Sequence, residues 1–295
     1  VLYFRRIEPS VKLICKLREL KQKTPNLKMI MEIPTYPFGR EERCSISLKR
    51  RINRIIGEKL VRLYVDRIVL IGQKKPIEKL YGIQTICVNN GIDFNSVKIS
   101  ESSVSKDEIH MICVSGCFFW HGYDRIIEGM HIYYSKCEPK ENVYLHVVGE
   151  GECLQQYKEL AQKYDLLDKK VFFYGKKVGK ELDELFDKCD IALDSLGAHR
   201  KKIDVSSSLK SREYVAKGIP IATAVRLDIQ NERTERFILM FSADEEPIPI
   251  ERLVQFYYDL YEDNRREDIA EEIRKCFYPY CDWEFAFRDV IEYIK

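Results

Sequence analysis

The most informative segment of the chain runs Ser208-Leu209-Lys210-Ser211-Arg212-Glu213-Tyr214-Val215-Ala216-Lys217-Gly218-Ile219-Pro220-Ile221-Ala222. It predicts a loop that feeds a short helix, a stop at Gly218 and a buried strand that Pro220 opens. The start of a helix has unpaired N–H groups and the positive end of a dipole, which suit a phosphate. Glu213 lies one turn inside, where its carboxylate can reach a sugar hydroxyl. An ordinary capped helix between two strands would have the same pattern, so the segment alone leaves both interpretations open.

The composition indicates a globular protein with a substantial core. The chain has 295 residues, of which 45% are hydrophobic and 33% charged. Its longest apolar runs have the length of strands, so we expect no membrane-spanning helix. Arg5 and Arg6 follow the first apolar residues at once, which does not fit a signal peptide. Ten cysteines are scattered without the spacing of a metal site, which favours reduced thiols in a cytoplasmic protein.

The charge is distributed unevenly along the chain. Residues 1–75 hold 19 lysines and arginines against 7 acidic residues, whereas the remainder holds 30 against 40. Within 44–63, Ile52, Ile55 and Ile56 recur at helical spacing among six basic residues, which predicts a basic amphipathic helix. Such a helix can lie on an anionic membrane, or it can bury its isoleucines and leave a solvated basic face. No motif for nucleic acid accompanies it, so we expect no nucleic-acid partner.

Strand-sized apolar runs alternate with helical patterns, which predicts an α/β fold with parallel sheets. We expect a partial Rossmann-like domain over 1–95, a polar linker over 96–107 and a complete doubly wound domain over 108–275, followed by a C-terminal helix over 276–295. The first part has few strands and begins with one at residue 2, so we expect the front of its domain to be missing. Ligands of such sheets bind beyond the carboxyl ends of the strands, which makes the following loops the candidate site.

From about residue 109 onward the chain resembles the C-terminal domain of GT-B glycosyltransferases, above all retaining family 4. The motifs that carry the resemblance occur in family order: Gly116, His121-Gly122, Val147-Val148-Gly149-Glu150-Gly151, Val171-Phe172-Phe173-Tyr174-Gly175, Asp190-Ile191-Ala192-Leu193 and the Lys210–Pro220 segment. Asn90-Gly91-Ile92-Asp93 matches the interdomain position, and the tryptophan-containing C-terminal helix is similar to one that crosses back onto the N-terminal domain. Trp120–Arg125 and Glu32–Pro37 are similar to a bacterial surface-polysaccharide branch.

The resemblance implies GT-B architecture, with two Rossmann-like domains facing a cleft. It implies a hexosyltransferase-type enzyme that transfers a sugar with retention from a UDP- or GDP-linked donor. The acceptor would be a growing polysaccharide or a lipid-linked oligosaccharide. GT-B enzymes stabilise the departing diphosphate with N–H donors and cations, so no metal or other cofactor is expected. Asp190 and Asp194 are too enclosed by apolar residues to suggest a metal pair.

The resemblance also implies roles for individual residues. The diphosphate would lie over Leu209 and Lys210, with Ser208 also in the donor site, and Glu213 would bind the ribose. The donor site would also include Gly116, Gly149, Glu150, Gly151 and Lys176, where paired glycines allow close approach of a ligand. Tyr36 ends a strand on the acceptor side, although it is equally suited to be a rigid turn residue between Pro34 and Pro37.

The chain departs from the family at two positions. The first glutamate of the family pair falls on Val205, with Asp204 adjacent, which puts the sugar-binding carboxylate in doubt. Cys117 and His121 stand where the family has an arginine and a lysine. Cationic help would then come from Lys210, His199, Arg200 or Arg212, with Lys210, His121 and Arg200 as the catalytic candidates. Each could instead be a structural or solvated residue of its loop.

These departures leave other functions open. The chain could be a catalytically silent GT-B module that binds nucleotides, or a nucleotide-sugar epimerase of the same architecture. We expect a cytoplasmic protein, whose basic helix would bring it to the inner leaflet of the cytoplasmic membrane as a peripheral protein.

Overall fold

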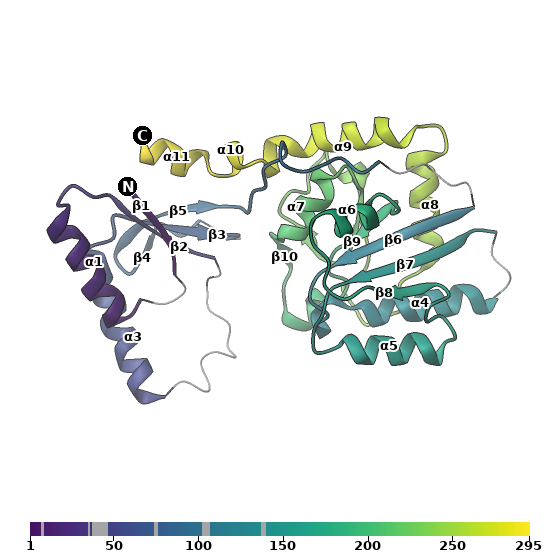
Figure 1. Cartoon of the computed structure of the whole chain (residues 1–295), viewed down its shortest axis with the longest axis horizontal. Coiled ribbons are helices and arrows are strands. Elements are labelled where there is room, and N and C mark those ends of the chain that lie inside the picture. The colour runs from purple at the N-terminus through teal and green to yellow at the C-terminus, as the bar shows by residue number, and fades with distance from the viewer. Residues whose placement is uncertain (7–8, 35, 37–46, 74–75, 102–106, 137–139) are drawn as a thin grey trace. The chain divides into compact units, whose positions relative to one another are not determined.

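The computed structural model describes residues 1–6, 9–34, 36, 47–73, 76–101, 107–136 and 140–295. The chain divides into two compact units (Figure 1). The first unit comprises Val1–Asn90 and Trp283–Lys295, and the second comprises Gly91–Asp282. The divisions therefore fall after Asn90 and after Asp282, rather than at the expected linker and at residue 276.

The first unit is built on a five-stranded sheet in the order β1-β2-β3-β5-β4. Its strands are β1 (Leu2–Arg5), β2 (Met29–Ile33), β3 (Arg67–Ile71), β4 (Lys79–Leu80) and β5 (Ile83–Val88). All neighbours pair in parallel except β4 and β5, which form a hairpin. The short strand β4 was not expected from the sequence.

Helices cover both faces of this sheet, because side chains alternate along a strand. On one face, Met29 and Met31 of β2 share a core with Ile14 and Leu17 of α1 (Val11–Lys23). On the other, Ile30 packs with the C-terminal helices α10 (Trp283–Ala286) and α11 (Arg288–Ile294). These helices are separate, because the chain leaves helical geometry at Phe287, so the expectation of one continuous helix was wrong.

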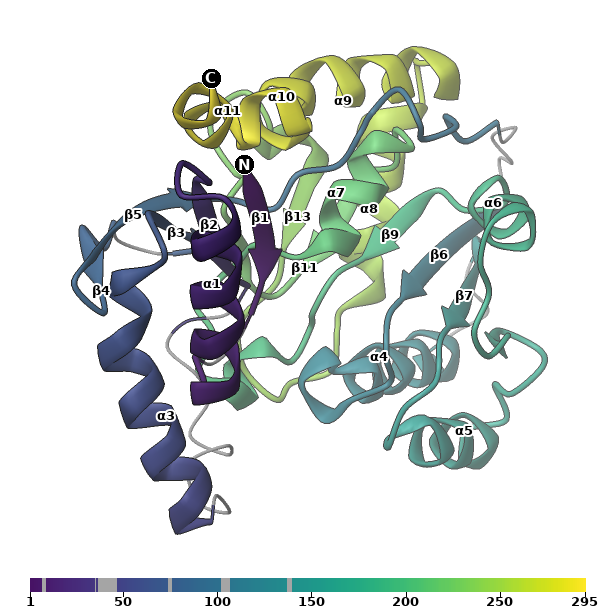
Figure 2. The same ribbon diagram turned by 60° about the vertical axis from the view of Figure 1, so that its left-hand side comes forward.

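Helix α3 (Leu48–Leu60) continues into a 3₁₀ turn, η1 (Val61–Leu63), and lies beside α1 (Figure 2). We expected the isoleucines of this helix to be buried if it packs as an ordinary surface helix. They are exposed instead, and Gly57 is its buried residue. Gly57 lies so close to Pro9 that a Cβ atom would sit 2.6 Å from the Pro9 carbonyl oxygen. Because the helix packs through this glycine, its isoleucines face outward.

The second unit contains a six-stranded, wholly parallel sheet in the order β13-β11-β9-β6-β7-β8. The strands are β6 (Glu108–Val114), β7 (Asn142–Val148), β8 (Val171–Phe173), β9 (Ile191–Leu193), β11 (Ile221–Thr223) and β13 (Ile238–Met240). The chain builds outward from β6 in one direction and then from β9 in the other. The strand order therefore reverses between β6 and β9, which is the switch point of a doubly wound fold.

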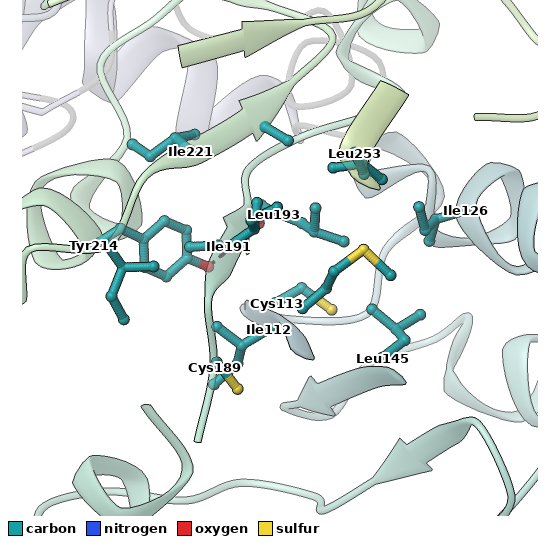
Figure 3. Close-up of a cluster of buried hydrophobic side chains, with 14 of the residues drawn as sticks. Ile112, Cys113, Ile126, Leu145, Cys189, Ile191, Leu193, Tyr214, Ile221 and Leu253 are labelled. Atoms are coloured by element: carbon teal, nitrogen blue, oxygen red, sulfur yellow. Dashed lines mark hydrogen bonds between the residues drawn. The ribbon is translucent and has the colours of Figure 1, made fainter. Parts of the chain in front are cut away.

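Helices lie on both faces of this sheet, as right-handed connections require. They are α4 (Tyr123–Lys136), α5 (Leu154–Lys163), α6 (Lys180–Phe186), α7 (Leu209–Ala216), α8 (Ile250–Tyr261) and α9 (Arg266–Cys281). Helices α4 and α5 pack together, and α7 packs against α9. The core between them includes Ile112, Ile191 and Ile221 of three adjacent strands (Figure 3).

Several short elements complete the second unit. A two-stranded parallel ribbon, β10 (Val205–Ser206) with β12 (Arg226–Leu227), was not expected from the sequence. The 3₁₀ turns are η2 (Phe119–His121), η3 (Ala198–Lys201) and η4 (Glu235–Phe237). No helix in the described part of the chain is both long and apolar enough to cross a membrane.

Candidate functional site

The candidate site of the second unit lies at its switch point. The loops after β6 and β9 leave neighbouring strands at their carboxyl ends, and they are joined where the Leu196 amide donates to the His121 carbonyl (2.8 Å). In open α/β sheets ligands bind in the crevice at this position. Helix α7, which follows β9 and the β10 strand, begins beside the same loops, because Ser208 and Lys210 contact the residues just after β9.

Ser208 caps the start of α7. Its extended backbone precedes the helix, and its Oγ accepts a hydrogen bond from the Ser211 amide (3.2 Å). The same hydroxyl donates to the Asp194 carboxylate at 2.6 Å. Leu209 is exposed beside it. Since the first amides of a helix have no acceptor within the helix, this open N-terminus suits an anion.

Lys210 is held in place by two groups from the end of β9. Its Nζ lies 3.1 Å from Asp194 Oδ1 and 3.1 Å from Ser195 Oγ. The Asp194 side chain is fully buried and that of Lys210 is 11% exposed. Burial by itself would raise the pKa of Asp194, but Lys210, Ser208 and the Ser195 amide lower it below its usual value. The anchored pair was missed from sequence, where Asp194 was considered only as a metal ligand.

Tyr214 links α7 to the two strands that flank the switch point. Its phenol accepts from the Val114 amide of β6 (2.9 Å) and donates to the Leu193 carbonyl of β9 (3.4 Å). The ring is fully buried against the strands (Figure 3). Lys210 and Tyr214 are four residues apart, so one helix turn separates the anchored ammonium group from the buried phenol.

Glu213 is half-buried, three residues after Lys210, and therefore its neighbour on the helix surface. Burial raises the pKa of its carboxyl; Lys217 opposes this shift and Asp183 adds to it. Lys217 is itself paired with Asp183. The predicted ribose ligand is thus close to Lys210 in sequence and on the same helix.

His121 is a buried, neutral imidazole at this site. Only 9% of the residue is exposed, and its ring stacks on Tyr123 at a centroid distance of 5.6 Å. Burial, with a further contribution from the nearby Lys210 charge, lowers its pKa to about 3. It contacts Trp120 only in a tilted arrangement. A neutral imidazole can donate or accept a hydrogen bond but adds no positive charge at neutral pH.

The glycines of the candidate loops serve close packing between loops. Gly149 has φ of +141°, and a Cβ atom there would collide with the Ser115 carbonyl. At Gly151 it would lie 2.5 Å from the Cys117 carbonyl oxygen. The Cys117 amide donates to the Glu150 carbonyl at 2.9 Å. The sequence interpretation assigned these glycines to approach by a ligand, whereas in the structure the space beside each is filled by backbone. At Gly116, a Cβ would meet the Phe118 ring.

Three of the candidate cations have structural partners. Arg200 bridges Asp124 (2.7 Å) and Glu245, and His199 Nε2 lies 2.7 Å from Glu245. Arg212 is fully buried and paired with Asp228, which ties α7 to the segment after β12. The expectation that Arg212 is an available cation was wrong, and the guanidinium of Arg200 is already shared between carboxylates. Lys210 is the candidate cation that the structure places at the helix start.

The other residues that the sequence singled out are Lys176, Tyr36 and Val205. Lys176 is exposed after β8. Tyr36 is half-buried against the core of the first unit, and its carbonyl accepts from Gln73 (3.0 Å). Val205 lies in the β10 ribbon, next to the exposed Asp204.

Among the described residues no group of three or more His, Cys, Asp or Glu side chains could hold a metal ion. Thr35 and Pro37 of the predicted turn lie outside the described residues.

A buried arginine supports these loops and was also missed from sequence. Arg125 of α4 donates to the Leu196 carbonyl after β9, to the Glu246 carbonyl (2.7 Å) and to Asp244 (2.8 Å). It follows the His121-Gly122 turn closely in the sequence, and this closeness is the one signal by which the sequence could have identified it.

The comparisons with known proteins agree with this geometry. Residues 96–195, about a third of the chain, match the family model described as Glycosyl transferases group 1. No curated protein sequence matches the chain. A glycosyltransferase from Rickettsia africae superimposes with a TM-score of 0.64 at 12% identity, over 96% of this chain and 80% of that one. The chain has the GT-B fold.

Two further GT-B structures are similar at comparable levels. Anabaena Alr3699/HepE in complex with UDP has a TM-score of 0.62 at 14% identity, over 96% of this chain and 75% of that one. WaaG, a glycosyltransferase involved in lipopolysaccharide biosynthesis, has a TM-score of 0.56 at 15% identity, over 92% and 79%. The GT-B assignment accords with the doubly wound second unit and its switch point.

Proposed function

We propose that this protein is a GT-B glycosyltransferase that takes a sugar from a nucleotide-sugar donor. The observation that carries the proposal is the ammonium group of Lys210, anchored by Asp194 and Ser195 beside the open start of α7. The Anabaena structures in complex with UDP and with UDP-glucose support a nucleotide sugar as the ligand class. The match of residues 96–195 to Glycosyl transferases group 1 supports the reaction.

The chemistry of the site suits departure of a diphosphate. An ammonium group has three N–H donors. Among the described residues, Asp194 and Ser195 take two of those of Lys210, which leaves one for a phosphate oxygen. The amides of Leu209 and Lys210 and the dipole of α7 add partial positive charge. Because these groups are fixed before the reaction, they can stabilise the charge that develops as the sugar–oxygen bond breaks.

Glu213 and His121 would orient the donor. A ribose hydroxyl can donate to the Glu213 carboxylate, while the phosphates lie one turn earlier on the helix. The neutral His121 imidazole can donate an N–H to the sugar or to the diphosphate. Arg200, already shared between Asp124 and Glu245, would act by holding η3 and the loop after β9 in position.

The finer assignments follow from the family resemblance. We propose a UDP- or GDP-linked hexose donor, transfer with retention, and no metal requirement. The acceptor would be a growing polysaccharide or a lipid-linked oligosaccharide, with Tyr36 on its side. The backbone around Gly116 and Gly149-Glu150-Gly151, together with Lys176 and His199, would line the donor site.

Calorimetric titration with UDP and with GDP tests the binding half of the proposal. Glu213→Ala should weaken nucleotide binding by about 1.5–3 kcal/mol, as expected for loss of a charge-assisted hydrogen bond. Glu213→Gln should retain more affinity, since the amide oxygen still accepts. The matched control is Glu184→Ala, at an exposed position of α6. Unchanged affinity in Glu213→Ala would refute the ribose assignment.

Release of nucleoside diphosphate from UDP- and GDP-sugars, with and without saccharide acceptors, tests the reaction. We expect release that continues in EDTA. Binding without release would favour the catalytically silent module. Formation of an epimeric donor without acceptor would favour the epimerase. Activity that EDTA abolishes and Mg²⁺ restores would contradict the metal-free mechanism.

A further inference from the structure

Helix α3 exposes an apolar stripe on the side opposite its contact with the rest of the first unit. Leu48 is 72% exposed, Ile52 49%, Ile55 41% and Ile56 40%, and Leu63 of η1 is 62% exposed. Successive residues of an α-helix are rotated by about 100°. Leu48 and Ile55 therefore point about 160–180° away from Gly57, the residue that packs on Pro9. We define these five residues as the apolar stripe.

The inner side of the helix explains this orientation. Gly57 allows a close approach to Pro9, and the Asn53 side chain accepts from the Val11 amide at the start of α1 (3.0 Å). Leu60, which is partly buried against the core of the first unit, supplies the apolar part of this contact. The stripe is thus not required for packing within the first unit.

Basic side chains border the stripe. Lys49, Arg51, Lys59 and Arg62 are all exposed, and Glu58, the one acidic residue in 48–63, pairs with Arg54 at 3.5 Å. A cavity of about 550 Å³ opens at the end of the stripe, lined by Ile55, Glu58, Lys59, Arg62, Tyr81 and Gly82. Two cations at its wall suit the phosphate of a headgroup.

We infer that this surface docks on an anionic membrane, with the stripe among the acyl chains and the bordering cations on the headgroups. A helix with isoleucines and leucines on one side and lysines and arginines along its edges is suited to lie in the plane of a lipid interface. This inference does not depend on the nucleotide site, because it uses residues of the first unit alone.

The charge of the surface argues against other occupants. A second copy paired about a twofold axis would bring the same cationic surface against itself, which like-charge repulsion opposes. A nucleic acid would contact the basic residues but would leave the apolar stripe without a role. An anionic bilayer satisfies both the charge and the apolar area.

Vesicle flotation of the whole protein tests the inference. We expect binding to phosphatidylcholine vesicles that contain phosphatidylglycerol, and much weaker binding to phosphatidylcholine alone. Raising NaCl from about 0.1 M to 0.5 M should weaken the binding, since the screening length shortens. Equal binding to both vesicle types, or binding to neither, would overturn the inference.

Two pairs of variants separate the contributions of charge and apolar area. Ile52→Ser/Ile55→Ser should lower partitioning at least tenfold at unchanged net charge, whereas Ile132→Ser/Ile203→Ser, each 38% exposed in the second unit, should not. Arg51→Glu/Lys59→Glu should abolish the preference for anionic vesicles. The control Lys180→Glu/Lys275→Glu makes the same charge change at exposed positions of the second unit and should retain it.

Further measurements distinguish loss of docking from misfolding, from failure of the nucleotide proposal and from dimer formation. Because the four substituted residues of α3 are exposed, far-ultraviolet circular dichroism should be unchanged in both variants. Nucleotide titration of Arg51→Glu/Lys59→Glu should match that of the unaltered protein, so that loss of docking is distinguished from failure of the nucleotide proposal. A dimer in solution that Ile52→Ser/Ile55→Ser converts to a monomer would identify the stripe as an interface between copies and would refute membrane docking.

Discussion

Helices α3 and α7 are both rich in positive charge, but they use it in opposite ways. In α7, Lys210 and Arg212 are each matched to one carboxylate, Asp194 and Asp228, and both pairs are largely buried. In α3, every cation except the half-buried Arg54 is exposed, and Leu48, Ile52, Ile55 and Ile56 are exposed with them. The first arrangement fixes a charge at one point, as recognition of a single ligand requires. The second spreads charge over a surface, as docking on an extended partner requires.

The difference also separates what each helix contributes to stability. Removing one partner of a buried ion pair leaves an uncompensated charge, whereas an exposed cation interacts mostly with water. The same residue type should therefore have very different effects on unfolding in the two helices. The two tryptophans allow the units to be followed separately, since Trp120 lies in the second unit and Trp283 in the first.

The largest expected effect is at the buried arginine. Arg212→Met should destabilise the second unit by about 3–5 kcal/mol, because Asp228 loses its partner in a buried site. Arg51→Met on α3 should change stability by no more than about 0.5 kcal/mol. Urea unfolding followed by Trp120 fluorescence in a Trp283→Phe background measures the first, and the reverse background measures the second. Equal effects of the two substitutions would contradict the comparison.

A smaller effect is expected within α3, where adding a methyl group to a glycine should cost more stability than shortening an isoleucine. Gly57→Ala should destabilise the first unit by about 1–3 kcal/mol, because the new methyl group collides with the Pro9 backbone. Ile55→Ala should cost no more than about 0.5 kcal/mol, since Ile55 is exposed. Trp283 fluorescence during urea unfolding reports both variants. If Ile55→Ala proved the more damaging, the isoleucines would be packed in solution and the docking inference would lose its basis.

The smallest effect concerns pH and distinguishes the units. The pKa of His121 is lowered to about 3 in the folded protein, whereas its unfolded value is about 6.5. The unfolded chain therefore binds a proton more readily, and the free energy of unfolding falls as the pH drops below about 6.5. Between pH 7 and 5.5 the loss should be about 1.3 kcal/mol. His121→Gln should lessen the pH dependence of the second unit by that amount. All five histidines lie in the second unit, so the first unit provides the internal control. An unaltered pH dependence in the variant would show that the His121 pKa is not depressed.

Local patterns in the sequence were sufficient to predict the regular elements of the fold. The alternation of strands and helices from Ile109 to Leu260 is confirmed, and the short helix after Ser208 begins at Leu209 as expected. Apolar periodicity and capping residues act over a few positions, which is why they can be recognised in one chain. The break at Phe287 was missed, because the apolar pattern continues across it.

Contacts between distant residues could not be predicted in this way. The pairing of Lys210 with Asp194 follows from the adjacency of β9 and the start of α7, and Arg200 meets Glu245 across 45 residues. Periodicity indicated that α3 is amphipathic, but it could not show which side of the helix faces the first unit. The contact of Gly57 with Pro9 turns the isoleucines outward, against the expectation that they are buried. Such choices depend on tertiary packing, which no local pattern records.

The interlocked loops around Gly149 and Gly151 have a consequence for the thermodynamics of ligand binding. The amides of Cys117, Gly149 and Cys153 donate to backbone carbonyls of neighbouring loops, and the Ser115 amide donates to the carbonyl of Val148 at the end of β7. These amides should therefore exchange with deuterium as slowly as those of the adjoining strands, although they lie outside them. A platform already ordered in this way has little conformational entropy left to lose when a ligand arrives. The unfavourable entropy of association should then come mainly from restricting the ligand.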